Sequence, residues 1–283
     1  AVLDRIIVQI PDLLTAEESY FINSLINQEG FNSYYCAPLI TKGQLKGVLE
    51  IYFRQPYHAD QEWLEFLETL AQLSAIAINN AELLNSFQAG QFELVNAYEN
   101  SLQGWSQAIE QQIGNGEKEL QLLVDLSVKL AERMGMNRTE LANFKRGVLL
   151  HDIGMASIPG AILSKPEKLT ESEWQLVQAH PLQARSLLSK SKVLVNIMDI
   201  PYYHHERLNG SGYPDGLKGK AISLAARIFG MVDVYVALIS RRPYRKAWPK
   251  SRAMDYLQEQ SGKLFDPKVE EIFRQILMDD SAK

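Results

Sequence analysis

The sequence of 283 residues has little of several features, and each scarcity excludes a class of protein. A single cysteine, Cys36, excludes an intrachain disulfide framework and a metal site built from cysteines. No apolar run approaches the ~18 residues that a membrane-spanning helix needs, so no membrane association is expected. With 34 acidic and 29 basic residues, the net charge of −5 gives no reason to expect a nucleic-acid polymer as partner. No secretory signal is visible, and we expect a reducing, cytoplasmic setting.

The composition, 46% apolar and 22% charged, is that of a globular chain with a real core. The first part reads as mixed α/β. Short β-branched or apolar runs predict strands at Arg5–Ile10, Ser33–Ile40 and Leu45–Phe53, and a helical pattern covers Glu17–Gln28. The connection Thr41–Gln44 contains one glycine, as a hairpin requires.

A long helical region follows from Asp60. It is predicted to continue into a connector helix over residues 83–114, which Gly114-Asn115-Gly116 interrupts. From Leu84 onward, apolar residues recur at steps of three and four, or sums of these, along one narrow stripe. These are Leu84, Phe87, Leu94, Tyr98, Leu102, Trp105 and Ile109. The stripe predicts a homodimer; packing of the same residues within their own domain is the alternative.

Beyond the connector the chain reads as almost all helical. Asn137 with Glu140, and Thr170 with Glu173, have the spacing of capping boxes at two helix starts. A proline at the first helical position, Pro267, marks the start of a final helix.

Four of the five histidines lie between positions 151 and 205. A lone buried histidine is more often a hydrogen-bonded core residue than a ligand, but the neighbours change that expectation. An aspartate in the otherwise apolar run 228–234 is expensive to bury unless it is paired or bound to a cation. One metal site would satisfy all of these groups together. The candidate ligands are His151, Asp152, His180, His204, His205 and Asp233.

Six candidates exceed what one structural zinc takes, so two ions are favoured. Adjacent residues on a helix point about 100° apart, which makes His151 and Asp152 unequal as ligands to one ion, whereas an aspartate can bridge two ions. Nitrogen and oxygen donors together suit iron, our first expectation, or manganese, nickel or zinc. Two ions ~3.5–4 Å apart can clamp a phosphodiester and generate a nucleophile from water near neutral pH.

The region from Pro201 to Ala253 holds ten Lys and Arg against three Asp and Glu, a balance of +7. This favours an anionic, phosphate-bearing substrate over an ordinary solvated basic face.

Several motifs, in order along residues 97–278, resemble the HD-GYP family of bacterial cyclic di-GMP phosphodiesterases. They are His151-Asp152-Ile153-Gly154, His204-His205-Glu206, Gly210-Ser211-Gly212-Tyr213-Pro214-Asp215-Gly216, Asp233-Val234-Tyr235 and Arg242-Pro243-Tyr244-Arg245. The resemblance implies an all-helical bundle around a metal centre with the six ligands named above, and it makes Asp152 the bridging, catalytic carboxylate. It also implies that Arg242, Arg245 and Tyr213 contact substrate and that the Gly210–Gly216 loop contacts diguanylate cyclase (GGDEF) partners.

Residues 1–82 resemble the carboxy-terminal portion of a GAF domain, a small sensory module of ~150 residues by family expectation. The resemblance lies in Ser33–Ile40, in Gly47-Val48-Leu49-Glu50 and in the helix at Leu73–Ala77. The predicted organisation is therefore a truncated α/β GAF-like domain at 1–82, a connector helix at 83–114 and an all-α HD-GYP domain at 115–283.

The sequence departs from the HD-GYP pattern at polar positions near the motifs. The altered positions are Asn115, Glu119, Met155, Asn209, Val236 and Arg241. The first two replace a glutamate and a histidine that support a third ion, so two ions are expected. The others suggest weakened or altered chemistry.

The first hypothesis is a binuclear metal phosphodiesterase that converts cyclic di-GMP mainly to linear pGpG. The alternative is a catalytically weak or inactive domain that binds metal and nucleotide as a signalling scaffold. A hydrolase for another cyclic dinucleotide or nucleotide is a third, weaker reading.

Overall fold

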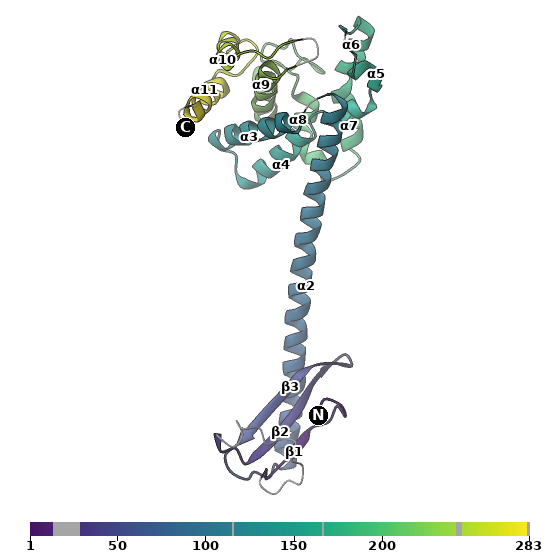
Figure 1. Cartoon of the computed structure of the whole chain (residues 1–283), viewed down its shortest axis with the longest axis vertical. Helices are drawn as coiled ribbons and strands as arrows, with labels where there is room; N and C mark the ends of the chain where they lie inside the picture. Colours follow the sequence, from purple (N-terminus) through teal and green to yellow (C-terminus); the bar gives the residue numbers. More distant parts are fainter. Residues whose placement is uncertain (14–28, 115, 166, 242–244, 282–283) are drawn as a thin grey trace. The chain divides into compact units, whose positions relative to one another are not determined.

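The computed structural model describes residues 1–13, 29–114, 116–165, 167–241 and 245–281. The predicted helix at Glu17–Gln28, and the residues Asn115 and Arg242, lie outside this range. The chain divides into two compact units, Ala1–Asn96 and Ala97–Lys283, and helix α2 (Gln61–Gln112) contributes to both (Figure 1). Each unit is described by itself.

The N-terminal unit contains a three-stranded antiparallel sheet in the order β1-β2-β3. The strands are β1 (Val8–Ile10), β2 (Ser33–Thr41) and β3 (Gln44–Phe53). β2 and β3 form the predicted hairpin. The predicted first strand was too long at its start: Arg5 has φ 56°, and this left-handed backbone interrupts the extended conformation that a strand needs.

One face of this sheet is covered by the first turns of α2. The buried helix residues Leu67 and Ala71 pack on the β2 residues Tyr35 and Leu39. The Tyr35 hydroxyl donates to the carbonyl of Tyr57 (2.7 Å), so this buried polar group is satisfied.

The start of α2 is set by Asp60, whose carboxylate accepts a hydrogen bond from the backbone N–H of Trp63 (2.8 Å). The helix is continuous to Gln112 and stops before Gly114, which has φ 82°. The two helical patterns expected on either side of residue 83 therefore form one helix.

The C-terminal unit is helical, as the fold class predicted. Its longer helices are α3 (Glu117–Arg133), α4 (Arg138–Leu149), α6 (Glu171–Gln178), α7 (His180–Leu188), α9 (Leu224–Ile239), α10 (Lys250–Glu259) and α11 (Pro267–Ser281). Its short turns are η2 (Ile153–Ser157), α5 (Gly160–Leu163), η3 (Leu194–Ile197), α8 (Asp199–Tyr203) and η4 (Gly219–Ala221). In the described ranges, no helix combines the length and the apolar character that a membrane span requires.

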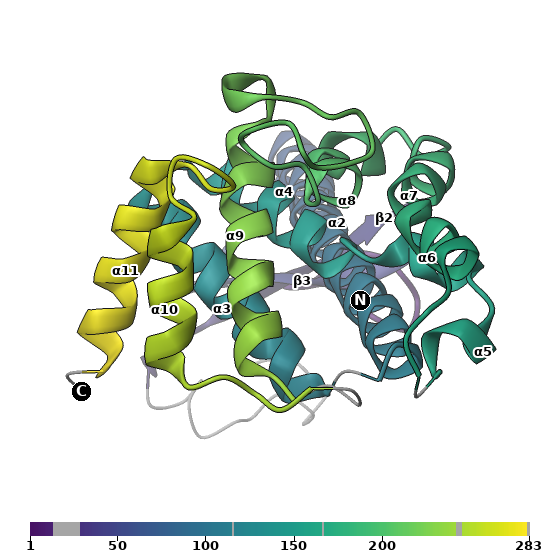
Figure 2. The same cartoon turned by 90° about the horizontal axis from the view of Figure 1, so that it is seen from above.

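The main core of this unit lies where α3, α4 and α9 meet, with α10 and α11 beside α9 (Figure 2). Phe229, Met231 and Phe273 are among its fully buried side chains. A second cluster joins Leu102, from the last part of α2, to Leu150 and Ile197. This second cluster thus packs the last part of α2, the end of α4 and η3 against one another within this unit.

Both predicted capping boxes are present. The Asn137 side chain accepts from the backbone of Glu140, whose carboxylate accepts in return from the Asn137 N–H. Thr170 and Glu173 form the same reciprocal pair at the start of α6.

Candidate metal centre

His151 directly follows α4, where its ring is held by its own helix. Its Nδ1 lies 2.8 Å from the carbonyl oxygen of Val148. Because a carbonyl oxygen only accepts, this nitrogen carries the proton, and in the neutral ring Nε2 presents a lone pair. The same bond fixes the direction in which Nε2 points.

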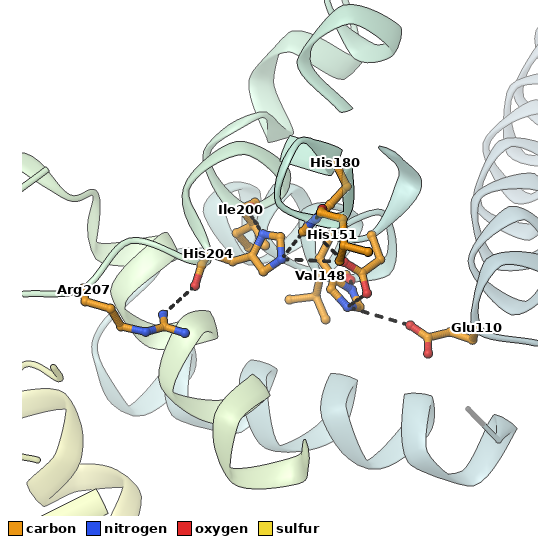
Figure 3. Close-up of polar contacts among 9 residues, drawn as sticks. Glu110, Val148, His151, His180, Ile200, His204 and Arg207 are labelled. Atoms are coloured by element: carbon orange, nitrogen blue, oxygen red, sulfur yellow. Dashed lines mark hydrogen bonds and ion pairs between the residues drawn. The ribbon is translucent and has the colours of Figure 1, made fainter. Parts of the chain in front are cut away.

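Two further histidines use the same local device. His180 begins α7 and donates from Nδ1 to the Val177 carbonyl (2.8 Å), and His204 follows α8 and donates from Nδ1 to the Ile200 carbonyl (2.9 Å). Metal-binding histidines typically donate their other ring nitrogen to a carbonyl or carboxylate in this way. All three rings therefore direct Nε2 inward (Figure 3).

The Nε2 atoms converge on Asp152. Its Oδ1 lies 3.3 Å from Nε2 of His180 and 3.7 Å from that of His204, while Oδ2 lies 3.2 Å from Nε2 of His151. Nε2 of His180 and Nε2 of His204 are 3.4 Å apart. Two lone pairs that face each other beside a carboxylate repel, and a proton or a cation between them removes the repulsion. The donors present thus fit a metal ion.

The potential ligand atoms form two groups, each within 4.8 Å, that share Asp152. The first contains Asp152, His180, His204 and His205, and we call it the histidine-rich position. The second contains Glu110, His151 and Asp152, and we call it the carboxylate-rich position. Asp152 thus turns one oxygen toward the histidines of each group.

Asp233, from α9, belongs to neither ligand group but lies beside the carboxylate-rich position. It lines a cavity of about 50 Å³ together with Glu110, Glu119, His151 and Asp152. Of the six candidate ligands named from the sequence, five fall in the two ligand groups, and Asp233 lies at the adjoining cavity.

Glu110 is a site residue that sequence reasoning missed. It lies near the end of α2, is 4% exposed, and places Oε1 3.8 Å from Nε2 of His151 (Figure 3). No motif contains it. The one available signal was Ile109, the last apolar residue of the helical stripe, which indicates that this part of α2 packs against something.

The pKa values of the histidines are shifted in opposite directions. Burial lowers the pKa of His180 to about 4 and lowers that of His205 well below its ordinary value. Burial also acts to lower the pKa of His151, but nearby carboxylates, Asp152 first, outweigh it and raise the pKa to about 10. The pKa of Asp152 is held well below its usual range because His151 outweighs burial, which acts to raise it. A proton on His151 thus offsets part of the charge of the carboxylates, and a divalent cation would supply a larger positive charge in its place.

The glycine-rich loop is attached to the ligand segment by Glu206. Its Oε1 accepts from the N–H groups of Asp215 (2.8 Å) and Gly216 (3.0 Å), and Oε2 accepts from Leu217 (2.9 Å). The buried carboxylate therefore orders the loop beside the histidines.

Tyr213, in that loop, stacks on the ring of His205 with centroids 4.6 Å apart and planes 28° apart. Burial, followed by the charge of Asp152, raises the pKa of Tyr213, so its hydroxyl stays protonated and can donate a hydrogen bond.

Arg245 is hydrogen-bonded to α9, the helix that carries Asp233. Its Nη2 donates to the carbonyl of Ala237 (2.6 Å), a residue that also lines the 50 Å³ cavity. Its buried Nε has no hydrogen-bond partner among the residues that the structure describes. This leaves one donor of the Arg245 guanidinium available.

Three glycines allow the ligand segments to approach this closely. A methyl group at Gly154 would overlap the carbonyl oxygen of His180, and methyl groups at Gly212 and Gly230 would overlap those of His205 and His204. A side chain at any of these positions would displace the backbone of a ligand.

The altered positions of the sequence have distinct surroundings. Val236 is buried and lines the cavity, where it offers no polar atom. Glu119 lies at the same cavity and provides a carboxylate. Asn209 instead accepts hydrogen bonds from the N–H and hydroxyl of Ser211, within the loop.

Comparison with known proteins gives two domain matches. A model of the HD domain matches residues 100–269, and a model of the GAF domain matches residues 1–78. These matches, and the fold, confirm the resemblances drawn from the sequence motifs.

Three relatives illustrate the likeness. The cyclic di-GMP phosphodiesterase response regulator RpfG of Xanthomonas campestris pv. campestris is 42% identical over 166 residues, 58% of this chain and 44% of that protein. The cyclic di-GMP phosphodiesterase PA4108 of Pseudomonas aeruginosa is 47% identical over 122 residues, 43% of this chain and 29% of that protein. The 3'3'-cGAMP-specific phosphodiesterase 3 of Vibrio cholerae is 37% identical over 139 residues, 49% of this chain and 30% of that protein.

The chain spans less than half the length of each of these relatives. The HD domain match, in contrast, covers more than half of the chain and includes the residues of both ligand groups. The histidine and aspartate that give this domain its name are His151 and Asp152, at the middle of the centre described above. The chain therefore belongs to the HD domain family.

Proposed function

We propose that this protein is a binuclear metal-dependent phosphodiesterase that hydrolyses cyclic di-GMP, mainly to linear pGpG. The observation that carries the proposal is the pair of ligand groups that share Asp152, with three histidine rings fixed so that their Nε2 atoms face this carboxylate. The names of the relatives support the substrate.

A pair of divalent ions, when bound, activates water near neutral pH and polarises a phosphodiester. His151, Asp152, Asp233 and the histidine-rich position would hold this pair. Asp152, shared by both groups, would be a ligand of both ions, so it is the proposed catalytic residue and its loss would weaken both positions. Iron is the first expectation, with manganese, nickel or zinc as alternatives.

The remaining residues act on the substrate. Arg245, with its free Nε donor, and Arg242 are proposed to hold phosphate oxygens as negative charge develops in the transition state. Tyr213 is proposed to contact the substrate from the histidine side, where its ring is fixed by stacking on His205.

The test is product chromatography with metal-loaded protein. Cyclic di-GMP is expected to give pGpG, and the Asp152→Ala variant is expected to give none. Asp125→Asn, at an exposed carboxylate on α3, is the control. Absence of turnover by wild-type protein loaded with iron or with manganese would overturn the enzyme proposal.

One observation favours the alternative, a metal- and nucleotide-binding scaffold of weak or absent activity. Val236 presents an apolar side chain to the cavity, and Met155 takes the place of a cation that the resemblance implies. Calorimetry that shows nucleotide binding in a sample that forms no product would establish the scaffold.

The same assay settles the choice of dinucleotide. Relatives named as cyclic di-GMP and as 3'3'-cGAMP phosphodiesterases both match the chain. Parallel incubation with the two substrates is expected to give the larger kcat/KM for cyclic di-GMP.

A protein partner is proposed for the Gly210–Gly216 loop, namely a diguanylate cyclase (GGDEF) domain. Glu206 orders this loop while leaving Ser211 and Asp215 exposed, so a fixed surface is available. Calorimetry with such a domain is expected to show binding that Ser211→Arg weakens and that Ser189→Arg, at an exposed residue after α7, leaves unchanged. Equal binding by both variants would contradict the proposal.

We propose that the protein forms a dimer through residues 83–95 of α2, a shorter stretch than the apolar stripe from Leu84 to Ile109 that the sequence predicts. Leu102 and Ile109 are buried within the C-terminal unit, so they pack in their own domain. Between residues 83 and 95, however, six large apolar side chains are exposed, with Leu94 at 72%. Exposure on that scale, at helical spacing, favours a second copy of the same helix as the covering surface.

Light scattering tests the dimer. Wild-type protein is expected to have the mass of a dimer, and Leu94→Glu is expected to shift it toward the monomer. Asn96→Glu, on another face of the same helix, is the control. A monomeric wild type, or a dimeric Leu94→Glu variant, would contradict the proposal.

The division into a GAF-like domain at 1–82, a connector at 83–114 and a metal-binding domain at 115–283 remains part of this proposal, as does a cytoplasmic setting. Separate expression of residues 115–283 tests this division. If the division is right, the fragment folds on its own, but it lacks Glu110 and should bind metal more weakly at the carboxylate-rich position.

A further inference from the structure

The two metal positions differ in the chemistry of their donors. The histidine-rich position has three imidazoles and one carboxylate oxygen from Asp152. The carboxylate-rich position has one imidazole, from His151, and carboxylates from Glu110 and Asp152. Asp233 and Glu119 face the same cavity.

Glu110 is a buried member of the carboxylate-rich position. Its side chain is 6% exposed, and Oε1 lies 3.8 Å from the inward-facing Nε2 of His151. Burying a carboxylate is costly unless a positive charge accompanies it. The residue comes from α2, outside the motifs on which the family resemblance was drawn.

The cavity at this position is small and polar on several sides. Its volume of about 50 Å³ has room for an ion with one or two waters. Carboxylates from α2, α3 and α9 face it, so an ion there would be surrounded mainly by oxygen.

We propose that the metal centre is mixed: the carboxylate-rich position, completed by Glu110, selects manganese, and the histidine-rich position selects iron or zinc. Oxygen donors suit harder ions such as manganese, whereas imidazole donors favour ions later in the divalent series. The inference rests on the proposed metal-dependent function, because it assigns different ions to the same pair of positions.

The wild-type protein provides the first test. Metal-free protein receives one equivalent of Zn²⁺ and then one of Mn²⁺, and electron paramagnetic resonance with nitrogen-sensitive detection counts the imidazoles on manganese. One coordinated imidazole is expected, as His151 provides. Three coordinated imidazoles, or displacement of zinc by manganese, would overturn the proposal.

Variants give the second test. Glu110→Gln is expected to keep one bound Zn²⁺ and to lose Mn²⁺ affinity by about tenfold to a hundredfold. Glu93→Gln, an exposed carboxylate on the same helix, is the matched control. His180→Ala is expected to show the opposite pattern, with Mn²⁺ retained and Zn²⁺ weakened.

Glu110→His covers the case in which the glutamine variant fails to fold. An added imidazole is expected to move the preference of this position from manganese toward zinc. Unchanged manganese binding in Glu110→Gln and Glu110→His would remove Glu110 from the ligand set.

Measurements of metal binding and of hydrolysis distinguish failure of the mixed centre from failure of the proposed function. Protein that binds no ion at all overturns the proposed function. Protein that binds two ions without discrimination, and still hydrolyses the substrate, overturns only the mixed centre.

Discussion

The histidine-rich and carboxylate-rich positions are held in place by different means. In the first, His180 and His204 are each fixed by a hydrogen bond to a carbonyl three or four residues earlier. In the second, Glu110 and Asp233 come from α2 and α9, and only the packing of these helices brings them to His151. Local bonds therefore orient the histidine rings, that of His151 included, whereas the carboxylates of Glu110 and Asp233 are placed by tertiary packing alone.

The difference implies different sensitivities. A ring fixed by its own helical turn keeps its direction when neighbouring helices shift slightly. A carboxylate carried by a separate helix moves with that helix. Perturbing Asp152 should affect both positions, whereas changes in α2 should affect only the carboxylate-rich one.

The largest effect is expected from Asp152→Asn, which removes the carboxylate that both metal positions share. Both positions lose a charged ligand, so bound metal is expected to fall for both ions and kcat by at least about 10³-fold. Metal analysis together with product chromatography measures this. A variant that keeps one tightly bound ion would show that Asp152 serves a single position.

Gly154→Ala should weaken metal binding at the histidine-rich position more than at the carboxylate-rich position. The added methyl group overlaps the His180 carbonyl, so the start of α7 must move, at a cost of about 1–3 kcal/mol in the free energy of unfolding. Zinc binding at the histidine-rich position is expected to weaken more than manganese binding. Gly160→Ala has open space around the new methyl group and is the control for both measurements.

Glu206→Gln tests the loop beside the histidine-rich position. The carboxylate that accepts three backbone hydrogen bonds is replaced by an amide with one acceptor oxygen, at a cost of about 2–3 kcal/mol. KM for the dinucleotide is expected to rise, because Tyr213 loses its fixed place, while the metal content stays at two ions. Denaturant unfolding and steady-state kinetics measure the two effects. Glu259→Gln, at an exposed carboxylate of α10, should change neither.

The smallest effect is expected at Glu173, a carboxylate outside both positions. Its hydrogen bond with Lys165, and then that with the Thr170 N–H, lowers its pKa to about 2. A lowered carboxylate pKa stabilises the fold above the ordinary value of 4.5, and this contribution is lost as the pH falls toward 2. The stability difference between wild type and Glu173→Gln, measured by urea unfolding, should therefore shrink from pH 6 to pH 3. Metal binding should be identical in the two proteins.

The sequence predicted the histidine side better than the carboxylate side, and the reason is physical. Capping boxes such as Asn137–Glu140 are local patterns, and the structure confirms them. His180 and His204 could be selected because their neighbours mark helix ends. Their convergence on Asp152 follows from family motifs and not from spacing alone.

What the sequence could not give depends on tertiary packing. Glu110 reads as one more polar residue at the end of a helix, and only its burial against the C-terminal unit reveals its place. Leu102 and Ile109 fit a dimer stripe by periodicity but are buried within their own unit. At the other end of the chain, the left-handed backbone of Arg5 shortened a strand that β-branched residues had favoured.

The close approach of Gly154, Gly212 and Gly230 to the three ligand carbonyls has a consequence for protein engineering. Grafting the donor side chains alone onto another helical scaffold would not reproduce the centre, because side chains at the positions of these glycines would hold the donor segments apart. A transplant would have to carry the glycines with the ligands, although none of the three has a side-chain atom able to bind a cation.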